Sequence, residues 1–473
     1  MDTDNKFSFL SSLLLFILLG FIGSITPYGY LLILIVCCYV FFSGVSFEKL
    51  LEFMWPLLII SLFVGTYFGI PGHENIYLFR FLLPIYIGIL FVFGQLNLKN
   101  LSYYKIPLLI LLILFILSSA SYMFALYKDQ VFRYSYYLLE IFLIFFLCFE
   151  KITSKKELLK TMNYVNYFFI ANLLVGIVEI LLGIHLKLSS ANIYVTTTIK
   201  YQPTGFFYNT NDYALFISVY YPIIIYFIRN KFLNWRLHAV YVLVTLTSLF
   251  VVISSYSRLG ILSLGINVVI TVYQFYGKKF NLIAFLGFPI WFYSILKIPL
   301  LNNLFNTIFV SFTQKNGSTS ARELLYQRLW QICKDSKFMG IGAGGAPRKL
   351  YNMNLGFESI NSDGYSTGHN FFLELLANLG IFGFSLFMLL IIYVVKVIVR
   401  NANCPKVRLK DKDSVLMGIE VLTSFLASMI ALSTVIEKRY LWFSLIIILI
   451  SLQQSYYLQG KIDNKDFAFN MYK

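Results

Sequence analysis

Long apolar runs, repeated along almost the whole chain, most constrain how this sequence can fold. About twenty apolar residues in a helix cross the hydrocarbon core of a bilayer, whereas an open strand leaves its backbone groups unsatisfied in lipid. On this measure we predict about fourteen spanning helices, or about twelve to fourteen because only Pro27 separates the first two runs. The predicted spans are residues 8–26, 28–46, 50–70, 76–94, 105–126, 131–149, 162–184, 211–228, 237–256, 259–276, 280–299, 371–395, 415–434 and 440–458. The expected fold is an all-α, polytopic transmembrane helical bundle that forms one integral membrane domain over residues 1–473.

The composition excludes a soluble globular protein. Of the 473 residues, 59% are hydrophobic and 13% are charged, whereas a soluble chain carries roughly 25% charged residues. The net charge of +16 would favour a nucleic-acid partner in a soluble protein, but in a membrane protein Lys and Arg gather in the cytoplasmic loops. We therefore expect the lipid bilayer, and no nucleic acid, as a partner. The five cysteines show neither metal-site nor disulfide spacing.

Four basic clusters predict the orientation of the chain in the membrane. Counting the predicted spans between these clusters places all four on one side, together with both chain termini. The clusters are residues 151–160, 229–236, 278–279 and 396–412. Because positively charged loops stay in the cytoplasm, we predict a multi-pass protein with cytoplasmic N- and C-termini. The first apolar run lacks a small-residue cleavage site, so we expect it to remain as a helix.

Two larger loops fall on the opposite, extracytoplasmic side: residues 185–210 and residues 300–370. They differ from the cytoplasmic loops because they are rich in Tyr, Thr, Asn, Gly and isolated Arg. Such side chains suit sugar hydroxyls and phosphates better than they suit a topology signal. We expect the larger loop to be partly helical and to carry part of an active site.

Arginines on the outer side are candidate phosphate ligands. Arg258 lies between two spans, Arg322 and Arg328 share a helix-like segment of the larger loop, and Arg133 flanks another span. The planar guanidinium binds phosphate with two parallel hydrogen bonds and does not lose its charge. The alternative is that these arginines reach toward lipid headgroups or pair with carboxylates such as Glu323.

His369 is the candidate acid–base group. It follows a glycine at the mouth of a predicted span, with Asn370 next and Glu374 one helical turn further on. A histidine can accept and return a proton near neutral pH, and Glu374 would orient it. The alternative is that His369 is only a polar cap. The other three histidines lack such neighbours and are interpreted as structural: His73, His185 and His238.

The smaller loop ends in a polar and aromatic stretch from Tyr201 to Asp212 that leads into a span. Asn209, Thr210 or Asn211 would cap that helix. The same amides and aromatic rings would equally suit a sugar site. Both interpretations stay open from the residues alone.

Four glycines of the larger loop, at positions 340, 342, 344 and 345, resemble a phosphate-binding loop only loosely. They lack the following Lys-Ser/Thr of a nucleotide P-loop, so we predict a tight backbone turn beneath the site instead. Four charged residues inside or near the ends of spans are expected to have a partner or a wet cavity: Arg80, Glu140, Glu179 and Glu374. Arg80 with Glu140 is one conceivable pair. A charge at the centre of the bilayer costs roughly 2.5–3.5 kcal/mol.

These features occur in an order that resembles the O-antigen ligase/polymerase superfamily of bacterial envelope assembly. Pro203 to Asn211 precedes a span, Ser257-Arg258 lies between two spans, and Arg322 to Trp330 opens the long loop. Met339 to Gly344 follows, and His369-Asn370 with Leu379 to Gly383 closes the loop. The resemblance covers roughly residues 200–395 and departs from the family pattern at Leu259, where a small residue is common.

The resemblance implies metal-independent glycosyl transfer at the outer face of the bacterial cytoplasmic membrane, without a cofactor. The donor would be a glycan on undecaprenyl diphosphate and the acceptor a second lipid-linked oligosaccharide, with a flippase and a chain-length regulator as expected protein partners. Arg258 and Arg322 would neutralise the diphosphate, and His369 would activate or orient the acceptor hydroxyl. The expected substrate-binding residues are Arg328, Arg133, Asn211, Asn370, Glu374 and Tyr201.

Three functions remain to be distinguished. The Lys-, Asn-, Tyr-, Phe- and Ile-rich composition is typical of low-GC organisms and favours a polymerase for capsule, exopolysaccharide or a teichuronic-acid-like polymer. The second function is a ligase that moves finished glycan to a lipid or protein acceptor. The third is a flippase for lipid-linked oligosaccharides, whose charges would lie at mid-membrane depth and not at the outer interface.

Overall fold

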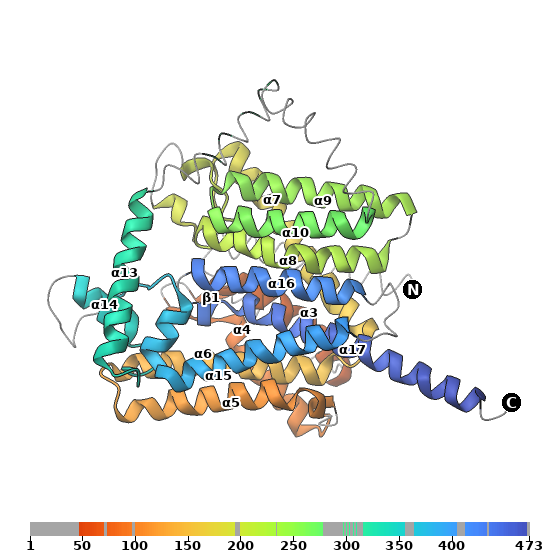
Figure 1. Ribbon diagram of the computed structural model, residues 1–473, viewed down its shortest axis with the longest axis horizontal. Coiled ribbons are helices and arrows are strands. Elements are labelled where there is room, and N and C mark those ends of the chain that lie inside the picture. The colour runs from red at the N-terminus through yellow and green to blue at the C-terminus, as the bar shows by residue number, and fades with distance from the viewer. Residues whose placement is uncertain are drawn as a thin grey trace. The chain divides into compact units, whose positions relative to one another are not determined.

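The computed structural model describes residues 47–70, 73–96, 100–193, 199–232, 234–277, 316–354, 364–403, 412–432 and 435–470, with single positions between 297 and 309 (Figure 1). Nearly all of these residues are helical, and eight helices among them are long and apolar enough to cross a membrane. The predicted all-α, polytopic fold is therefore confirmed. The predicted spans 8–26, 28–46 and 280–299 lie outside the described ranges, so the total number of spans stays a prediction.

The chain forms two compact units, of which the first comprises Met1–Leu96 and Asn163–Tyr213. Its described elements are α3 (Phe47–Val64), η1 (Gly65–Phe68), the hairpin of β1 (Gly69–Ile70) and β2 (His73–Tyr77), α4 (Leu78–Val92), most of α7 (Lys155–Leu182), η4 (Ser190–Asn192) and η5 (Ile199–Tyr201). Three phenylalanines join the membrane helices to the loop that follows α7. Phe63 stacks on Phe168 with ring centroids 5.0 Å apart, and Phe206 of the loop lies 5.5 Å from Phe168.

The second unit comprises Asn97–Met162 and Ala214–Lys473. Its elements are η2 (Asn100–Tyr104), α5 (Lys105–Ala120), η3 (Ser121–Met123), α6 (Lys128–Lys151), most of α8 (Thr210–Lys231), α9 (Asn234–Ser254), α10 (Arg258–Tyr276), α13 (Asn316–Asp335), α14 (Ala346–Asn354), α15 (Phe371–Ala402), α16 (Lys412–Ala431), η6 (Val435–Glu437) and α17 (Arg439–Asn470). A helix that is apolar all round belongs in the interior, and α8 is buried along most of its length. The Tyr220 hydroxyl of α8 donates to the Tyr440 carbonyl of α17 over 2.6 Å. Trp442 of α17 makes edge-to-face contacts with Phe371, Phe387 and Phe425.

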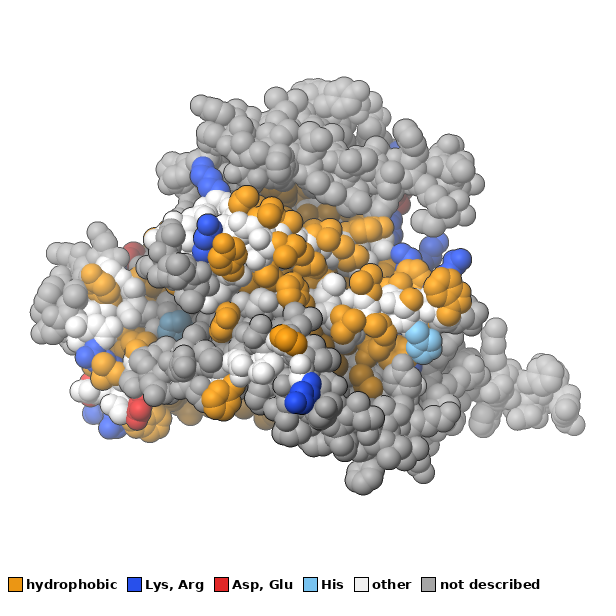
Figure 2. All heavy atoms as spheres, turned by 90° about the horizontal axis from the view of Figure 1, so that it is seen from above, with side chains coloured by type: hydrophobic (Ala, Val, Ile, Leu, Met, Phe, Trp, Pro, Cys, Tyr) orange, Lys and Arg blue, Asp and Glu red, His pale blue; other side chains and the backbone are white. Residues whose placement is uncertain are grey.

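Hydrophobic side chains cover much of the described surface on the face shown in Figure 2. Leu109, Ile116, Val269 and Leu389 are examples of large apolar side chains that are more than half exposed. In water, an exposed apolar surface of this extent would favour association. Here it is the surface that a bilayer would solvate.

The polar ends of several helices meet as the predicted orientation requires. Arg229, at the end of α8, pairs with Asp413 at the start of α16 over 3.2 Å and donates to Gln274 near the end of α10 over 3.1 Å. Arg229, a member of the basic cluster 229–236, therefore lies at the end of the second unit where α16 begins. The orientation of the chain in the membrane stays a prediction.

Helix α15 contains a sharp break at Gly380, where φ is 64° and ψ is −165°. The break releases backbone groups of α15, and the segment before α14 binds them. The N–H groups of Ile341 and Gly342 donate to the Ala377 and Asn378 carbonyls over 2.9 and 3.1 Å. The Ile381 N–H donates to the Phe338 carbonyl over 2.8 Å. Because lipid provides no hydrogen bonds, this pairing is what makes a broken helix tolerable in the membrane.

The glycine-rich stretch approaches its neighbours too closely for a side chain. A Cβ on Gly340 would lie 2.6 Å from the Asn378 carbonyl oxygen, and a Cβ on Gly342 would lie 2.4 Å from the Ala125 Cβ. Gly340 and Gly342 also have φ values of 84° and 104°, which favour glycine. The prediction of a tight backbone turn is therefore confirmed.

Candidate functional site

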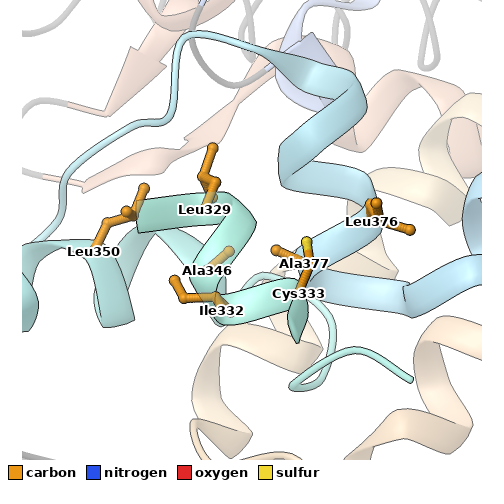
Figure 3. Close-up of a cluster of buried hydrophobic side chains, with 7 residues drawn as sticks. All are labelled: Leu329, Ile332, Cys333, Ala346, Leu350, Leu376 and Ala377. Atoms are coloured by element: carbon orange, nitrogen blue, oxygen red, sulfur yellow. The ribbon is translucent and has the colours of Figure 1, made fainter. Parts of the chain in front are cut away.

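A layer of α13, α14 and the first part of α15 lies at one end of the second unit, around a small apolar core (Figure 3). The core consists of Leu329, Ile332, Cys333, Ala346, Leu350, Leu376 and Ala377. The Ala346 N–H donates to the Asn378 side chain over 2.8 Å and fixes the start of α14 against α15. Burial raises the pKa of the Cys333 thiol to about 11, so Cys333 is protonated near neutral pH and serves as a core residue. The described part of the larger loop is partly helical, as predicted, with α13 and α14 joined by a non-helical turn.

His369 is fixed at the mouth of α15 by contacts on both sides. Its backbone has a φ of 49°, a left-handed conformation that costs a non-glycine residue on the order of 1–3 kcal/mol. The Tyr326 hydroxyl of α13 donates to the His369 carbonyl over 3.1 Å. Asn370 caps α15, because its side-chain oxygen accepts from the Leu373 N–H over 3.2 Å. On the ring itself, Nε2 lies 3.4 Å from the Thr367 hydroxyl.

Tyr326 connects His369 with the arginines of α13. Arg322 lies one helical turn before Tyr326 on the same helix. Burial raises the pKa of Tyr326, whereas the charge of Arg322 acts in the opposite direction. The phenol therefore stays protonated and can donate to His369. This tyrosine was missed in the sequence, although its spacing from Arg322 places both on one helix face.

Arg322 and Arg328 differ from Arg133 in their charge balance, because Arg133 is paired with a carboxylate. Among the described residues, neither has an ion-pair partner, and no pairing with Glu323 is seen. The Arg328 Nη1 is buried and has no hydrogen-bond partner. A buried donor of this kind is uncommon and calls for an explanation, such as an anion. These two arginines therefore have capacity to bind a phosphate group.

Arg133 is neutralised within the structure. Its guanidinium donates to Glu437 over 3.1 Å and to the Tyr137 hydroxyl over 3.0 Å. The same guanidinium lies 5.6 Å from the centre of the Tyr365 ring. This arrangement corresponds to the alternative of an arginine paired with a carboxylate. A role of Arg133 in substrate binding stays a prediction.

Two further ion pairs escaped the sequence analysis because each joins residues far apart in the chain. Arg439, at the start of α17, binds Glu140 of α6 over 3.0 Å, which supplies the partner expected for that carboxylate. Arg348 of α14 binds Asp129 of α6 over 2.8 Å. Glu374 is buried close to Gly368, where an added Cβ would lie 3.6 Å from the Glu374 Oε2.

Arg258 begins α10 at a close contact with α8. The Ser218 hydroxyl donates to the Gly260 carbonyl over 3.0 Å, and a Cβ on Gly260 would lie 2.6 Å from the Ala214 Cβ. Helix α16 runs antiparallel to α10, as the pairs Ser263–Ser424 and Thr271–Glu420 show. The start of α10 therefore lies at the same end of the second unit as η6 and Arg133.

Tyr201 and Asn211 belong to the first unit, where their substrate-binding roles remain predictions. The α8 cap is Asn209, whose side-chain oxygen accepts from the Asp212 N–H over 2.8 Å. In the loop before α8, the backbone N–H groups of Thr204 and Gly205 each donate a hydrogen bond to the Glu179 Oε2 over 2.7 Å. Glu179 thus has the partners expected of a buried charge.

His185 also faces this carboxylate, although sequence reasoning found no partner for it. Its Nδ1 lies 3.2 Å from the Glu179 Oε1, and its Nε2 lies 2.8 Å from the Lys200 carbonyl oxygen. The adjacent Glu179 carboxylate raises the pKa of His185, against the opposing effect of burial. The alignment at Nδ1 favours an ion pair over a linear hydrogen bond.

Comparison with known families supports the resemblance seen in the sequence. The sequence model of the family described as O-Antigen ligase matches residues 215–388, a segment that contains Arg258, Arg322 and His369. This part of the chain is therefore similar to the O-antigen ligase/polymerase superfamily. It is also similar to the teichuronic acid biosynthesis protein TuaE of Bacillus subtilis (strain 168), with 25% identity over 269 residues. That similarity covers 54% of this chain and 54% of TuaE, so it spans about half the length of the relative.

The described residues hold no group of three or more His, Cys, Asp and Glu side chains placed to bind a metal ion. Metal independence of the reaction stays a prediction.

Proposed function

We propose that this protein is a polysaccharide polymerase of the bacterial cytoplasmic membrane that works at the outer face. It transfers a nascent glycan from undecaprenyl diphosphate to a lipid-linked repeat unit. The observation that carries the proposal is the hydrogen bond from Tyr326 to the His369 carbonyl. It fixes a candidate base next to a helix whose arginines have no carboxylate partner among the described residues.

The arginines act on the leaving group. In the reaction, the bond between the anomeric carbon and the diphosphate oxygen breaks, and the electron pair leaves with the diphosphate. Negative charge therefore develops on the phosphates, where Arg322, Arg328 and Arg258 stabilise it. Placed charges of this kind favour the transition state over the ground state, and loss of one donor typically costs about 10²–10³ in rate. The guanidinium groups keep their charge throughout.

His369 acts on the acceptor. The acceptor hydroxyl oxygen forms the new bond to the anomeric carbon, and its proton passes to the His369 imidazole. General base catalysis of this kind contributes about 10²–10⁴ in rate when the base is correctly placed. The contacts of Tyr326, Asn370 and Thr367 around His369 support such placement.

The similarity to a protein described as acting in teichuronic acid biosynthesis favours a polymerase for a teichuronic-acid-like polymer over a ligase. The description of the matching family as O-Antigen ligase favours the second candidate, a ligase that moves finished glycan to another acceptor. Both use the same leaving group and the same base, so they differ only in the acceptor. A flippase and a chain-length regulator are the protein partners that we propose for the polymerase.

Deletion of the gene in its host, followed by sizing of the lipid-linked glycans, separates these functions. The polymerase proposal expects single repeat units on undecaprenyl diphosphate and loss of long polymer. Long lipid-linked polymer that never reaches its final acceptor would indicate the ligase. Repeat units trapped on the cytoplasmic leaflet would indicate a flippase and would contradict glycosyl transfer by this protein.

A further inference from the structure

Arg133 lies in a cluster that combines aromatic rings with balanced charge. Its guanidinium lies 5.8 Å from the centre of the Tyr137 ring and 5.6 Å from that of Tyr365. It binds Glu437 over 3.1 Å and the Tyr137 hydroxyl over 3.0 Å. The cluster therefore has two phenol rings, one guanidinium and one carboxylate within contact of one another.

The charge balance of this cluster disfavours a phosphate ligand. Glu437 cancels the charge of Arg133, and the buried Glu374 lies near enough to Tyr365 and Glu437 to interact with both electrostatically. A dianionic diphosphate would meet an arginine whose charge the Glu437 carboxylate already balances. By contrast, Arg322 and Arg328 have no carboxylate partner among the described residues.

The cluster is accessible and lies close to His369. The Arg133 side chain is 43% exposed and that of Glu437 is 25% exposed. Tyr365 is 39% exposed and precedes His369 by four residues in the same connecting segment. A ligand on this cluster would therefore contact the connecting segment that carries the candidate base.

A second ion pair holds the two sides of the cluster together. Helix α6 presents Arg133, Tyr137 and Glu140 along one face, at helical spacing. Arg133 binds Glu437, and Glu140 binds Arg439, two residues further along the facing turn. In the first ion pair α6 supplies the arginine, and in the second it supplies the carboxylate, so the two pairs together orient this turn against α6. Such a rigid arrangement of polar groups is typical of specific binding sites.

From this geometry we infer that Arg133, Tyr137, Tyr365 and Glu437 form a subsite for the glycan part of the substrate, and not for the diphosphate. A sugar ring offers an apolar C–H face, which packs on a phenol ring, and a rim of hydroxyls. The exposed guanidinium donates to these hydroxyls and the carboxylate accepts from them. This inference rests on the proposed function and names the part of the substrate that this cluster recognises.

The test compares two lipid probes with the full-length protein in nanodiscs. One probe is bare undecaprenyl diphosphate, and the other is the undecaprenyl-diphosphate-linked glycan isolated from the host. We expect the wild-type protein to bind the glycan-bearing lipid more tightly. The double variant Arg133→Gln/Glu437→Gln should weaken that binding about tenfold, the loss expected for one or two hydrogen bonds, and should leave the bare lipid unaffected.

Two further variants make the comparison specific. Tyr365→Ala removes an exposed ring without breaking either ion pair and should cause the same selective loss. Arg400→Gln removes an arginine at the opposite end of α15, where it binds Gln453, and should change neither affinity. Unchanged binding of bare lipid also shows that each variant is folded.

The outcomes separate this inference from the proposed function. An equal loss for both probes in the double variant would make Arg133 a phosphate ligand and overturn the inference. Unchanged affinity for both probes would also overturn it, and either result would leave the polymerase proposal intact. Failure of the wild-type protein to bind either lipid would overturn the proposed function and the inference with it.

Discussion

Replacing Tyr326 by phenylalanine removes one hydroxyl and keeps the ring, so it tests how His369 is positioned. The lost hydrogen bond to the His369 carbonyl spans 3.1 Å, and a bond of this kind contributes about 1 kcal/mol net. His369 has a φ of 49°, a conformation that persists only where surrounding contacts enforce it. About 1 kcal/mol corresponds to roughly a fivefold change in a population. We therefore expect kcat to fall roughly fivefold in Tyr326→Phe.

The assay is polymer formation by the reconstituted protein, with initial rates measured over a range of acceptor concentrations. KM should change little, because Tyr326 contacts the His369 backbone and not the substrate. Tyr273→Phe is the matched control, since it makes the same chemical change at an exposed tyrosine near the end of α10, away from the proposed site. An unchanged kcat in Tyr326→Phe, or an effect on KM alone, would refute the positioning of His369 by Tyr326.

Four other outcomes are expected. His369→Ala should abolish polymer formation while the protein is still produced, which gel analysis of polymer and protein from the same cells would show. Arg322→Lys should also lose most activity, because a lysine cannot form the paired hydrogen bonds of a guanidinium. Full activity in this variant would show that only the positive charge of Arg322 matters. Gly342→Ala should lower the thermal unfolding temperature in detergent, because its Cβ would lie 2.4 Å from a neighbouring Cβ. Glu179 raises the pKa of His185, so the charged pair stabilises the loop after α7. This stabilisation is fully present below the ordinary histidine pKa of about 6.5, and it is lost as the pH rises through the raised pKa. Proteolysis of this loop should accelerate with rising pH in the wild-type protein, and Glu179→Gln should remove that dependence.

Much of the architecture follows from local features of the sequence. Apolar runs of the right length predict helices such as α5 and α6 because each helix satisfies its own backbone. The glycine turn at 340–345 was predictable for a similar reason, since closely spaced glycines favour close backbone contacts. Counting spans likewise placed Arg229 at the same end as the start of α16, where it pairs with Asp413.

The parts that could not be predicted depend on contacts between distant residues. The break at Gly380 lies within an apolar run, and nothing local shows that the N–H groups of Ile341 and Gly342 bind the freed carbonyls. The pairing of Arg133 with Glu437 joins residues 304 positions apart. The sequence offered Arg133 as a phosphate ligand because its composition cannot show which arginines already have a carboxylate partner.

Reconstitution of the purified protein with lipid-linked repeat units is the most direct measurement of the proposed polymerase activity. The protein should lengthen the glycan and release one undecaprenyl diphosphate for each new linkage, whereas Arg322→Ala and His369→Ala should release none. If both variants elongated the glycan at the wild-type rate, Arg322 and His369 would not carry the reaction. Absence of both elongation and undecaprenyl diphosphate release with the wild-type protein would contradict the assignment of polymerase activity.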